Sequence, residues 1–279
     1  MTTPERLAVT SRDGVSISVE KSGSGPALLL VHGSMVDGAT SWAAVLPALR
    51  EHFTTYVMDR RGRAGSGDAP DYSLAAEVSD LIAVVDTIGE SLKLLAHSYG
   101  GVVTVAALDR LQRVSQLILY EPPIFERRRE GKAEAIRERM EEALRAGDRE
   151  QIVTIFLREQ IGAPPEALAG MKASPLWPSA LAAAHTLPRE IQVVNTLRVP
   201  AEKLKQCTIP TAMFVGTTSS ADLQESLQWV SGLIPSCRVV ALEGQGHVAM
   251  MSAPDLFVSK LLQVTGGAAN AASSTSLTY

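Results

Sequence analysis

The stretch LLAHSYGGVV, residues 94–103, decides how the rest of the chain is interpreted. An apolar run ends in the tight polar turn HSYGG, and a helical pattern follows it. This order is typical of the GxSxG elbow, whose strained turn lifts a serine Oγ above the edge of a sheet. The elbow needs small residues two positions before and after the serine, and here they are Ala96 and Gly100. Ser98 is therefore a candidate nucleophile, and the alternative is a capping serine in an ordinary strand-to-helix turn.

Apolar runs alternate with a helical pattern through the first half of the chain. Runs that are apolar throughout suit strands buried on both faces, and their alternation with helices indicates a mostly parallel sheet flanked by helices. The expected strands cover residues 15–21, 26–31, 54–58, 92–96 and 114–120, and the expected helix covers residues 74–88. Polar residues follow the strands, so the chemistry should collect at their carboxyl ends.

After Tyr120 the pattern becomes helical. Residues 126–147 are highly charged but place Ile136, Met140 and Leu144 four residues apart, which predicts an amphipathic helix. Further helical segments continue to about residue 205, and strand patterns return at residues 209–215 and 238–242, before a last helix at 254–264. We therefore expect a core domain in two parts, at residues 1–121 and 206–265, with a helical insertion at 122–205 between them. Residues 266–279 should form a disordered tail.

The composition excludes several classes of protein. The chain has 279 residues, 46% of them hydrophobic, and a net charge of −4, so it can bury a full core and shows no basic surface for nucleic acid. The start MTTPERLAVTSRDG lacks the regions of a secretory signal, and no apolar run approaches the roughly 18–20 residues of a membrane span. We expect a cytoplasmic protein that binds a small molecule, with neither nucleic acid nor membrane as partner; a homodimer stays open. Cys207 and Cys237 indicate reduced structural thiols.

Three further segments add to the candidate site. In LLLVHGSM, residues 28–35, an HG turn at a strand end can aim the backbone N–H of Ser34 at a developing oxyanion, and the N–H of Tyr99 would be the second donor. In EGQGHVAM, residues 243–250, His247 lies in a loop after the last expected strand, where a general base would fit. The glycine-rich turn MDRRGRAGSGD, residues 58–68, is interpreted as a structural loop that braces the site.

In this order, VHGS, DRRGRAGSGD, AHSYGG, LYEPP and GQGH resemble the α/β-hydrolase superfamily from about residue 10 to residue 264. The resemblance implies an α/β-hydrolase fold, with Ser98 as nucleophile and His247 as general base. It also implies that the helical insertion at 122–205 is a cap that closes a substrate pocket.

The acid of the expected triad departs from the family's pattern. Members usually carry an Asp in the turn after the strand equivalent to IPTAMFV, but this turn is GTTSSAD. Asp222 comes late in the turn, whereas Glu121 ends the preceding strand in LYEPP, and some relatives, haloalkane dehalogenases among them, take their acid from that strand. We favour Glu121 because a strand end fixes its position. Glu121 could instead brace the cap entrance, and Asp222 could cap the helix expected at residues 223–230.

The resulting hypothesis is a serine hydrolase that cleaves a small, apolar ester or lactone through an acyl-enzyme, with no metal or organic cofactor. Four apolar side chains near the motifs are candidates for lining the substrate pocket: Met35, Phe125, Trp177 and Met250. Two other classes stay open. One is a cofactor-free enzyme of non-hydrolytic type, such as a lyase, a cyclase or a perhydrolase-like oxidant generator. The other is a degenerate hydrolase that only binds a ligand, a class that the absence of an Asp from the usual acid position would fit.

Overall fold

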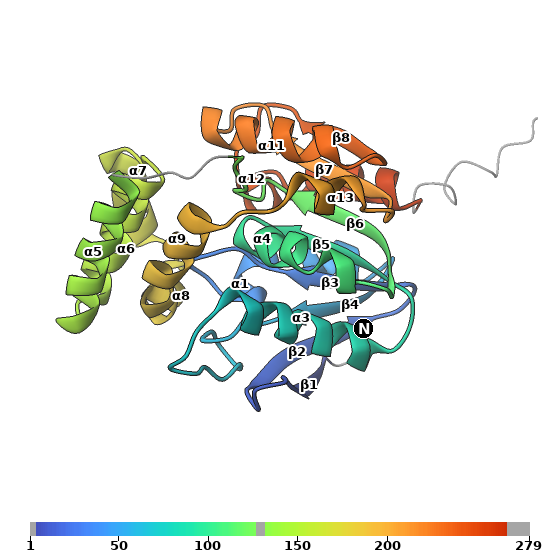
Figure 1. Ribbon diagram of the computed structural model, residues 1–279, viewed down its shortest axis with the longest axis horizontal. Helices are drawn as coiled ribbons and strands as arrows, with labels where there is room; N and C mark the ends of the chain where they lie inside the picture. Colours follow the sequence, from blue (N-terminus) through green and yellow to red (C-terminus); the bar gives the residue numbers. More distant parts are fainter. Residues whose placement is uncertain (1–3, 127–131, 267–279) are drawn as a thin grey trace, which may run out of the picture.

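An eight-stranded sheet forms the centre of the molecule, in the order β1-β2-β4-β3-β5-β6-β7-β8 (Figure 1). The computed structural model describes residues 4–126 and 132–266. The strands are β1 (Glu5–Thr10), β2 (Ser16–Gly23), β3 (Ala27–Val31), β4 (Thr54–Met58), β5 (Leu92–His97), β6 (Val114–Tyr120), β7 (Thr211–Gly216) and β8 (Cys237–Leu242). Strands β4, β3, β5, β6, β7 and β8 pair in parallel, and the hairpin of β1 and β2 joins antiparallel at β4. The α/β-hydrolase fold expected from the sequence is therefore confirmed.

Helices cover both faces of the sheet. Along β3, Leu29 belongs to the buried cluster that includes residues of α3 (Leu74–Ile88), α4 (Tyr99–Ala106) and α11 (Ala221–Leu233), whereas Leu28 and Leu30 belong to the cluster on the other face. The opposite layer consists of α1 (Gly38–Trp42), α2 (Leu46–Leu49), α12 (Ala249–Ser252) and α13 (Pro254–Thr265). All three leucines are fully buried, which explains why the central strands are apolar throughout.

The segment between β6 and β7 is helical and extends to one side of the sheet in Figure 1. It contains α5 (Lys132–Arg145), α6 (Arg149–Ile155), the π-helical turn η2 (Phe156–Gln160), α7 (Pro165–Ala173), α8 (Trp177–Ala183), the 3-10 turn η3 (Ala184–Thr186), α9 (Leu187–Thr196) and α10 (Ala201–Lys205). We call this segment the cap. Its helices bury a core of their own, which includes Ile136, Met140 and Ile152.

Several boundaries and burials differ from the expectations. Strand β1 escaped prediction because most of its side chains are exposed at the sheet edge and give no apolar run. Leu144 is 38% exposed rather than on the buried face of α5, because that face continues through its neighbour Ala143, which belongs to the cap core. Part of the helix expected at residues 126–147, and nearly all of the expected tail at 266–279, lie outside the described residues.

Two further expectations concern membrane-spanning helices and the state of the cysteines. No helix in the described ranges is long and apolar enough to cross a membrane. Both Cys207 and Cys237 are free thiols. Burial raises the pKa of the Cys237 thiol to about 11, which keeps it in the unreactive protonated form near neutral pH.

Candidate active site

Ser98 occupies the turn between β5 and α4 in a strained conformation, with φ 52° and ψ −121°. Its side chain makes no capping hydrogen bond to the helix, so the structure gives no support to the capping-serine alternative. A Cβ atom on Gly100 would lie 2.6 Å from the carbonyl oxygens of both Val31 and His32. The turn thus requires glycine there because the elbow presses against the end of β3.

Glu121 and His247 form a hydrogen-bonded pair at the carboxyl end of the sheet. Glu121 Oε2 lies 2.6 Å from His247 Nδ1, and Oε1 accepts a 2.7 Å hydrogen bond from the Gly216 N–H. The Glu121 side chain is fully buried, and its backbone has φ 46°, which is unusual for a residue with a side chain. Both carboxylate oxygens are therefore engaged, and one of them holds the imidazole by Nδ1. That leaves Nε2 as the nitrogen available for proton transfer.

Asp222, the alternative acid, lies in the first turn of α11 and lines the cavity described below. The N-cap of that helix is Ser220, so Asp222 does not take the capping position considered from the sequence. The structure therefore brings Glu121 to the imidazole of His247.

The turn after β7 uses its hydroxyl and amide groups to hold the histidine loop. The Thr217 hydroxyl accepts a 2.8 Å hydrogen bond from the Gly244 N–H, and the Thr218 N–H donates to the Gln245 carbonyl at 2.9 Å. A Cβ on Gly216 would lie only 2.4 Å from that same carbonyl. Where the family usually has its acid, this chain has a turn that supports the loop carrying His247.

Two aromatic residues that sequence reasoning missed also hold this loop. His97 Nε2 lies 2.8 Å from the His247 carbonyl, and because a carbonyl only accepts, the ring must donate. Burial and the neighbouring His247 depress the pKa of His97 well below its usual range, so it stays neutral. The Tyr120 hydroxyl donates to the Gly246 carbonyl and accepts from the Ala249 N–H. Their sequence signal is position alone: His97 precedes the candidate nucleophile, and Tyr120 precedes the candidate acid.

The two expected oxyanion donors lie at the same cavity. Tyr99 is the first residue of α4, so its N–H has no partner within the helix. Ser34 follows Gly33, and a Cβ on Gly33 would lie 2.9 Å from the Ser98 Cβ. The HG turn is therefore packed directly against the elbow, and Ser34 and Tyr99 line the same cavity as Ser98.

Ser98 and His247 both line a cavity of about 340 Å³ between the sheet and the cap. Its polar wall includes Ser34, Glu190 and Asp222, and its apolar wall includes Phe125, Phe156, Ile161, Ile191, Val194 and Leu223. Across the described residues, no direct hydrogen bond joins Ser98 Oγ to His247. In ligand-free sites such contacts often tighten only when substrate binds.

Of the four side chains expected to line the pocket, the structure places only Phe125 at the cavity. Met35 and Trp177 pack against the core of the cap. Met250 is 1% exposed and belongs to the core beneath the sheet, since α12 turns it away from the cap.

The glycine-rich turn after β4 buries a cluster of arginines beside the cavity. Arg60 pairs with Glu77 at 2.7 Å and with Glu190 of α9 at 2.5 Å, and Arg63 also donates to Glu190. Burial opposes ionisation of Glu190, but the two guanidinium groups outweigh it and hold the pKa of Glu190 below its usual range. The turn thus braces the site, as its sequence predicts, and it reaches the cap as well.

Parallel sheet, serine elbow, histidine loop and helical cap together define a protein of the α/β-hydrolase class. The chain belongs to this family: the model described as the alpha/beta hydrolase family matches residues 28–260. A pimeloyl-acyl-carrier-protein methyl ester esterase of Aeromonas hydrophila is 28% identical over 259 residues, which cover 90% of this chain and 100% of the relative.

Solved structures agree with this assignment. An alpha/beta hydrolase from Sphaerobacter thermophilus has a TM-score of 0.81 and 33% identity, covering 93% of this chain and 100% of its own. A hydrolase from Pseudomonas aeruginosa has a TM-score of 0.78 and 25% identity, with coverages of 94% and 98%. The chain is thus an enzyme of carboxylic-ester-hydrolase type.

Proposed function

We propose that this enzyme cleaves a small carboxylic ester through an acyl-enzyme on Ser98. The observation that supports this most directly is the 2.6 Å contact between His247 Nδ1 and the buried Glu121 carboxylate, at a cavity that Ser98 also lines. A carboxylate in that position fixes the tautomer of the imidazole and stabilises the imidazolium that forms during catalysis. A protein that only binds a ligand has no use for such a pair beside a strained serine.

The chemistry has two half-reactions. His247 Nε2 takes the proton of Ser98 as Oγ attacks the ester carbonyl, and the N–H groups of Ser34 and Tyr99 bind the oxyanion. The C–O bond then breaks, and the imidazolium returns its proton to the leaving alcohol. In the second half, the same imidazole deprotonates a water molecule that attacks the acyl-enzyme, which releases the acid and frees Ser98.

The cavity favours a compact substrate with an apolar part. Its volume of about 340 Å³ lies at the small end of the roughly 300–1,000 Å³ typical of ligand pockets. Phe125, Phe156 and Ile191 offer apolar contact to an acyl chain. Since curated relatives named for a methyl ester match 88–90% of this chain, methyl esters of medium-chain acids are the first substrates to test, followed by lactones.

The proposal is tested by intact-mass spectrometry after treatment with a fluorophosphonate, which phosphonylates activated serines. We expect one adduct on the wild-type protein and none on Ser98→Ala, with methyl ester hydrolysis lost in the same variant. Ser115→Ala is a matched control, because that serine lies on the neighbouring strand β6 outside the cavity and donates to the Leu92 carbonyl. A folded wild-type protein that takes up no probe would refute the proposal.

A further inference from the structure

The peptide that carries one oxyanion donor is held from behind by a buried arginine. The Gly33 carbonyl accepts a 2.8 Å hydrogen bond from His32 Nδ1 and a 3.0 Å hydrogen bond from Arg60 Nη1. The described chain has no cis peptide bonds, so this carbonyl and the Ser34 N–H point in opposite directions across one planar unit. Whatever fixes the carbonyl therefore also fixes the direction of the N–H.

Arg60 also contacts the residue that carries the second donor. Its guanidinium lies over the ring of Tyr99, 4.4 Å from the ring centre. Nε and Nη2 form a fork to Glu77, each at 2.7 Å, and the backbone N–H of Arg60 donates to His32 Nε2. With 0% exposure, the guanidinium is held in one orientation by charged partners, and charge-assisted bonds of this kind are the strong ones.

We propose that Arg60 is a positioning residue for the oxyanion hole and that Glu190 links it to the cap. This rests on the function proposed above. Arg60 touches no reacting atom; it orients the Gly33–Ser34 peptide through the carbonyl and supports Tyr99 through its ring. Glu190 of α9 accepts from Arg60 at 2.5 Å while lining the substrate cavity, so the cap helix and the donor peptide share one buried guanidinium.

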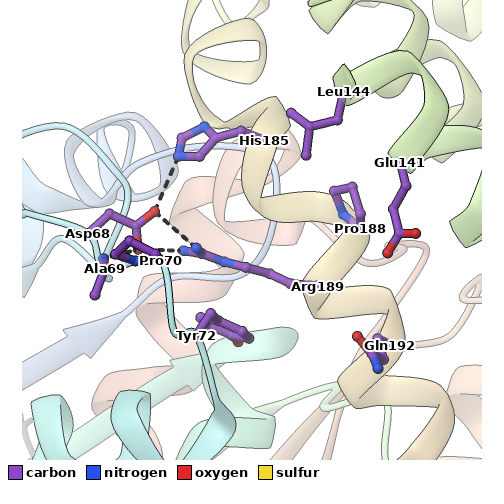
Figure 2. Close-up of a pocket in the computed structure, with 10 residues that line it drawn as sticks. All are labelled: Asp68, Ala69, Pro70, Tyr72, Glu141, Leu144, His185, Pro188, Arg189 and Gln192. Atoms are coloured by element: carbon purple, nitrogen blue, oxygen red, sulfur yellow. Dashed lines mark hydrogen bonds and ion pairs between the residues drawn. The ribbon is translucent and has the colours of Figure 1, made fainter. Parts of the chain in front are cut away.

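The neighbouring residue on α9 provides a useful contrast. Arg189 points away from the cavity into an outer groove of about 520 Å³, where it pairs with Asp68 beside His185 (Figure 2). This outer pair also ties the cap to the core. Within the described residues Arg189 makes no hydrogen bond with Gly33 or Tyr99, but its guanidinium lies 4.1 Å from the centre of the Tyr72 ring, and the Tyr72 hydroxyl is hydrogen-bonded to Tyr99 and Glu77. Asp68, the outer partner, is therefore the cleaner probe of cap attachment, whereas Glu190 reports on attachment together with the oxyanion hole.

The first test compares Arg60→Lys with Arg61→Lys. A lysine can keep the charge but cannot serve the Glu77 fork, Glu190 and the Gly33 carbonyl together. Arg61 comes from the same turn, is equally buried and pairs with Asp80 and Asp13 instead. We measure kcat and KM on a methyl ester, and the affinity of a trifluoromethyl ketone, whose adduct with Ser98 carries an oxyanion.

We expect Arg60→Lys to lower kcat and the affinity for the ketone, each by about tenfold or more, as part of the roughly 10²–10³ that a whole donor contributes. KM should stay close to the wild-type value, and Arg61→Lys should leave all three quantities near wild type. A folded Arg60→Lys with unchanged ketone affinity, or one in which only KM changes, overturns the proposal. So does an equal loss in Arg61→Lys.

A second pair of variants tests the same proposal if Arg60→Lys does not fold. Glu190→Gln preserves the shape of the side chain, and Asp68→Asn weakens the outer pair while Arg189 stays in place over Tyr72. We expect the ketone affinity to fall in Glu190→Gln and not in Asp68→Asn; equal affinities in the two folded variants contradict the link to the cap. Wild-type protein that reacts with the fluorophosphonate shows in parallel that a negative result concerns Arg60 and Glu190, not the esterase function.

Discussion

Strands β6 and β7 lie side by side in the sheet, yet their carboxyl ends supply different things to the site. β6 is followed directly by a buried carboxylate, Glu121, on a strained backbone, whereas β7 ends in Gly216 and is followed by a turn of hydroxyl residues. The second end donates an N–H to the first and holds the loop that carries His247. The carboxylate beside the imidazole is thus supplied at the end of β6, while the end of β7 supports the loop that carries the imidazole.

The largest effect should come from removing the charge at the end of β6. We expect Glu121→Gln to lower kcat by about 10⁴-fold, because the amide no longer fixes the tautomer of His247 or stabilises its positive charge. Asp222→Asn should stay close to wild type. Steady-state kinetics with circular dichroism as a folding control decide the matter, and equal activities of Glu121→Gln and wild type would reject the assignment of the acid.

The second-largest effect should come from adding a side-chain atom at the end of β7. In Gly216→Ala the new Cβ would meet the Gln245 carbonyl at 2.4 Å and the Gly246 carbonyl at 2.7 Å, so the histidine loop must move. A shift of about 1 Å can cost up to about 10²-fold in rate, so we expect kcat and the melting temperature both to fall. Gly232→Ala in α11 meets nothing within 4 Å and serves as the control. Unchanged activity in Gly216→Ala would show that the loop adapts freely.

Tyr120, the last residue of β6, should give a smaller effect that depends on pH. Burial raises the pKa of its hydroxyl above the usual value, so its contribution to stability is complete below pH about 10 and is lost as pH rises beyond that. Tyr120→Phe should cost about 1–3 kcal/mol at neutral pH, because the Gly246 carbonyl and the Ala249 N–H lose their partner. Urea unfolding at pH about 8 and about 10.5 checks this: the difference between the two proteins should shrink at the higher pH, and a constant difference argues against it.

The smallest effect should come from the hydroxyl turn itself. Thr217→Val keeps the shape of the side chain but leaves the Gly244 N–H without its acceptor. Because Thr217 is exposed, water can replace the hydroxyl, and the loss should be at most about 1 kcal/mol of stability. Thr217→Ser should behave as wild type in the same thermal melts. A large loss of kcat in Thr217→Val would mean that the exposed turn after β7 contributes to catalysis about as much as the buried carboxylate after β6.

Most of the fold could be predicted because its signals are local. The expected ranges 54–58, 74–88 and 114–120 match β4, α3 and β6 residue for residue, since each is an apolar pattern bounded by polar turns. The exposed edge strand β1 gave no such pattern. Local spacing likewise could not show that Ala143, rather than Leu144, continues the buried face of α5.

The site could be predicted only as far as its motifs extend. Ser98, His247 and Glu121 stand at strand ends and in turns, where sequence order limits their position. Met250 follows the histidine by only three residues, yet its helix turns it into the core. Arg60 and Glu190 are 130 positions apart, and no pattern in a single sequence pairs two charges over that distance.

The cap's separate core has a consequence for how this scaffold could change its substrate. Because Ile136, Met140 and Ile152 pack chiefly among cap residues, we expect that α5 and α6 can be exchanged without repacking the sheet next to Ser98. The end of the cap is different, since Val199 and Leu204 belong to the core of the sheet. The substrate range would then change with the exchanged helices, while Ser98, Glu121 and His247 keep their places at the end of the sheet. A transplanted cap would still have to present a carboxylate where Glu190 now meets Arg60 and Arg63, since without it two buried cations would lose a counter-charge beside the reaction centre.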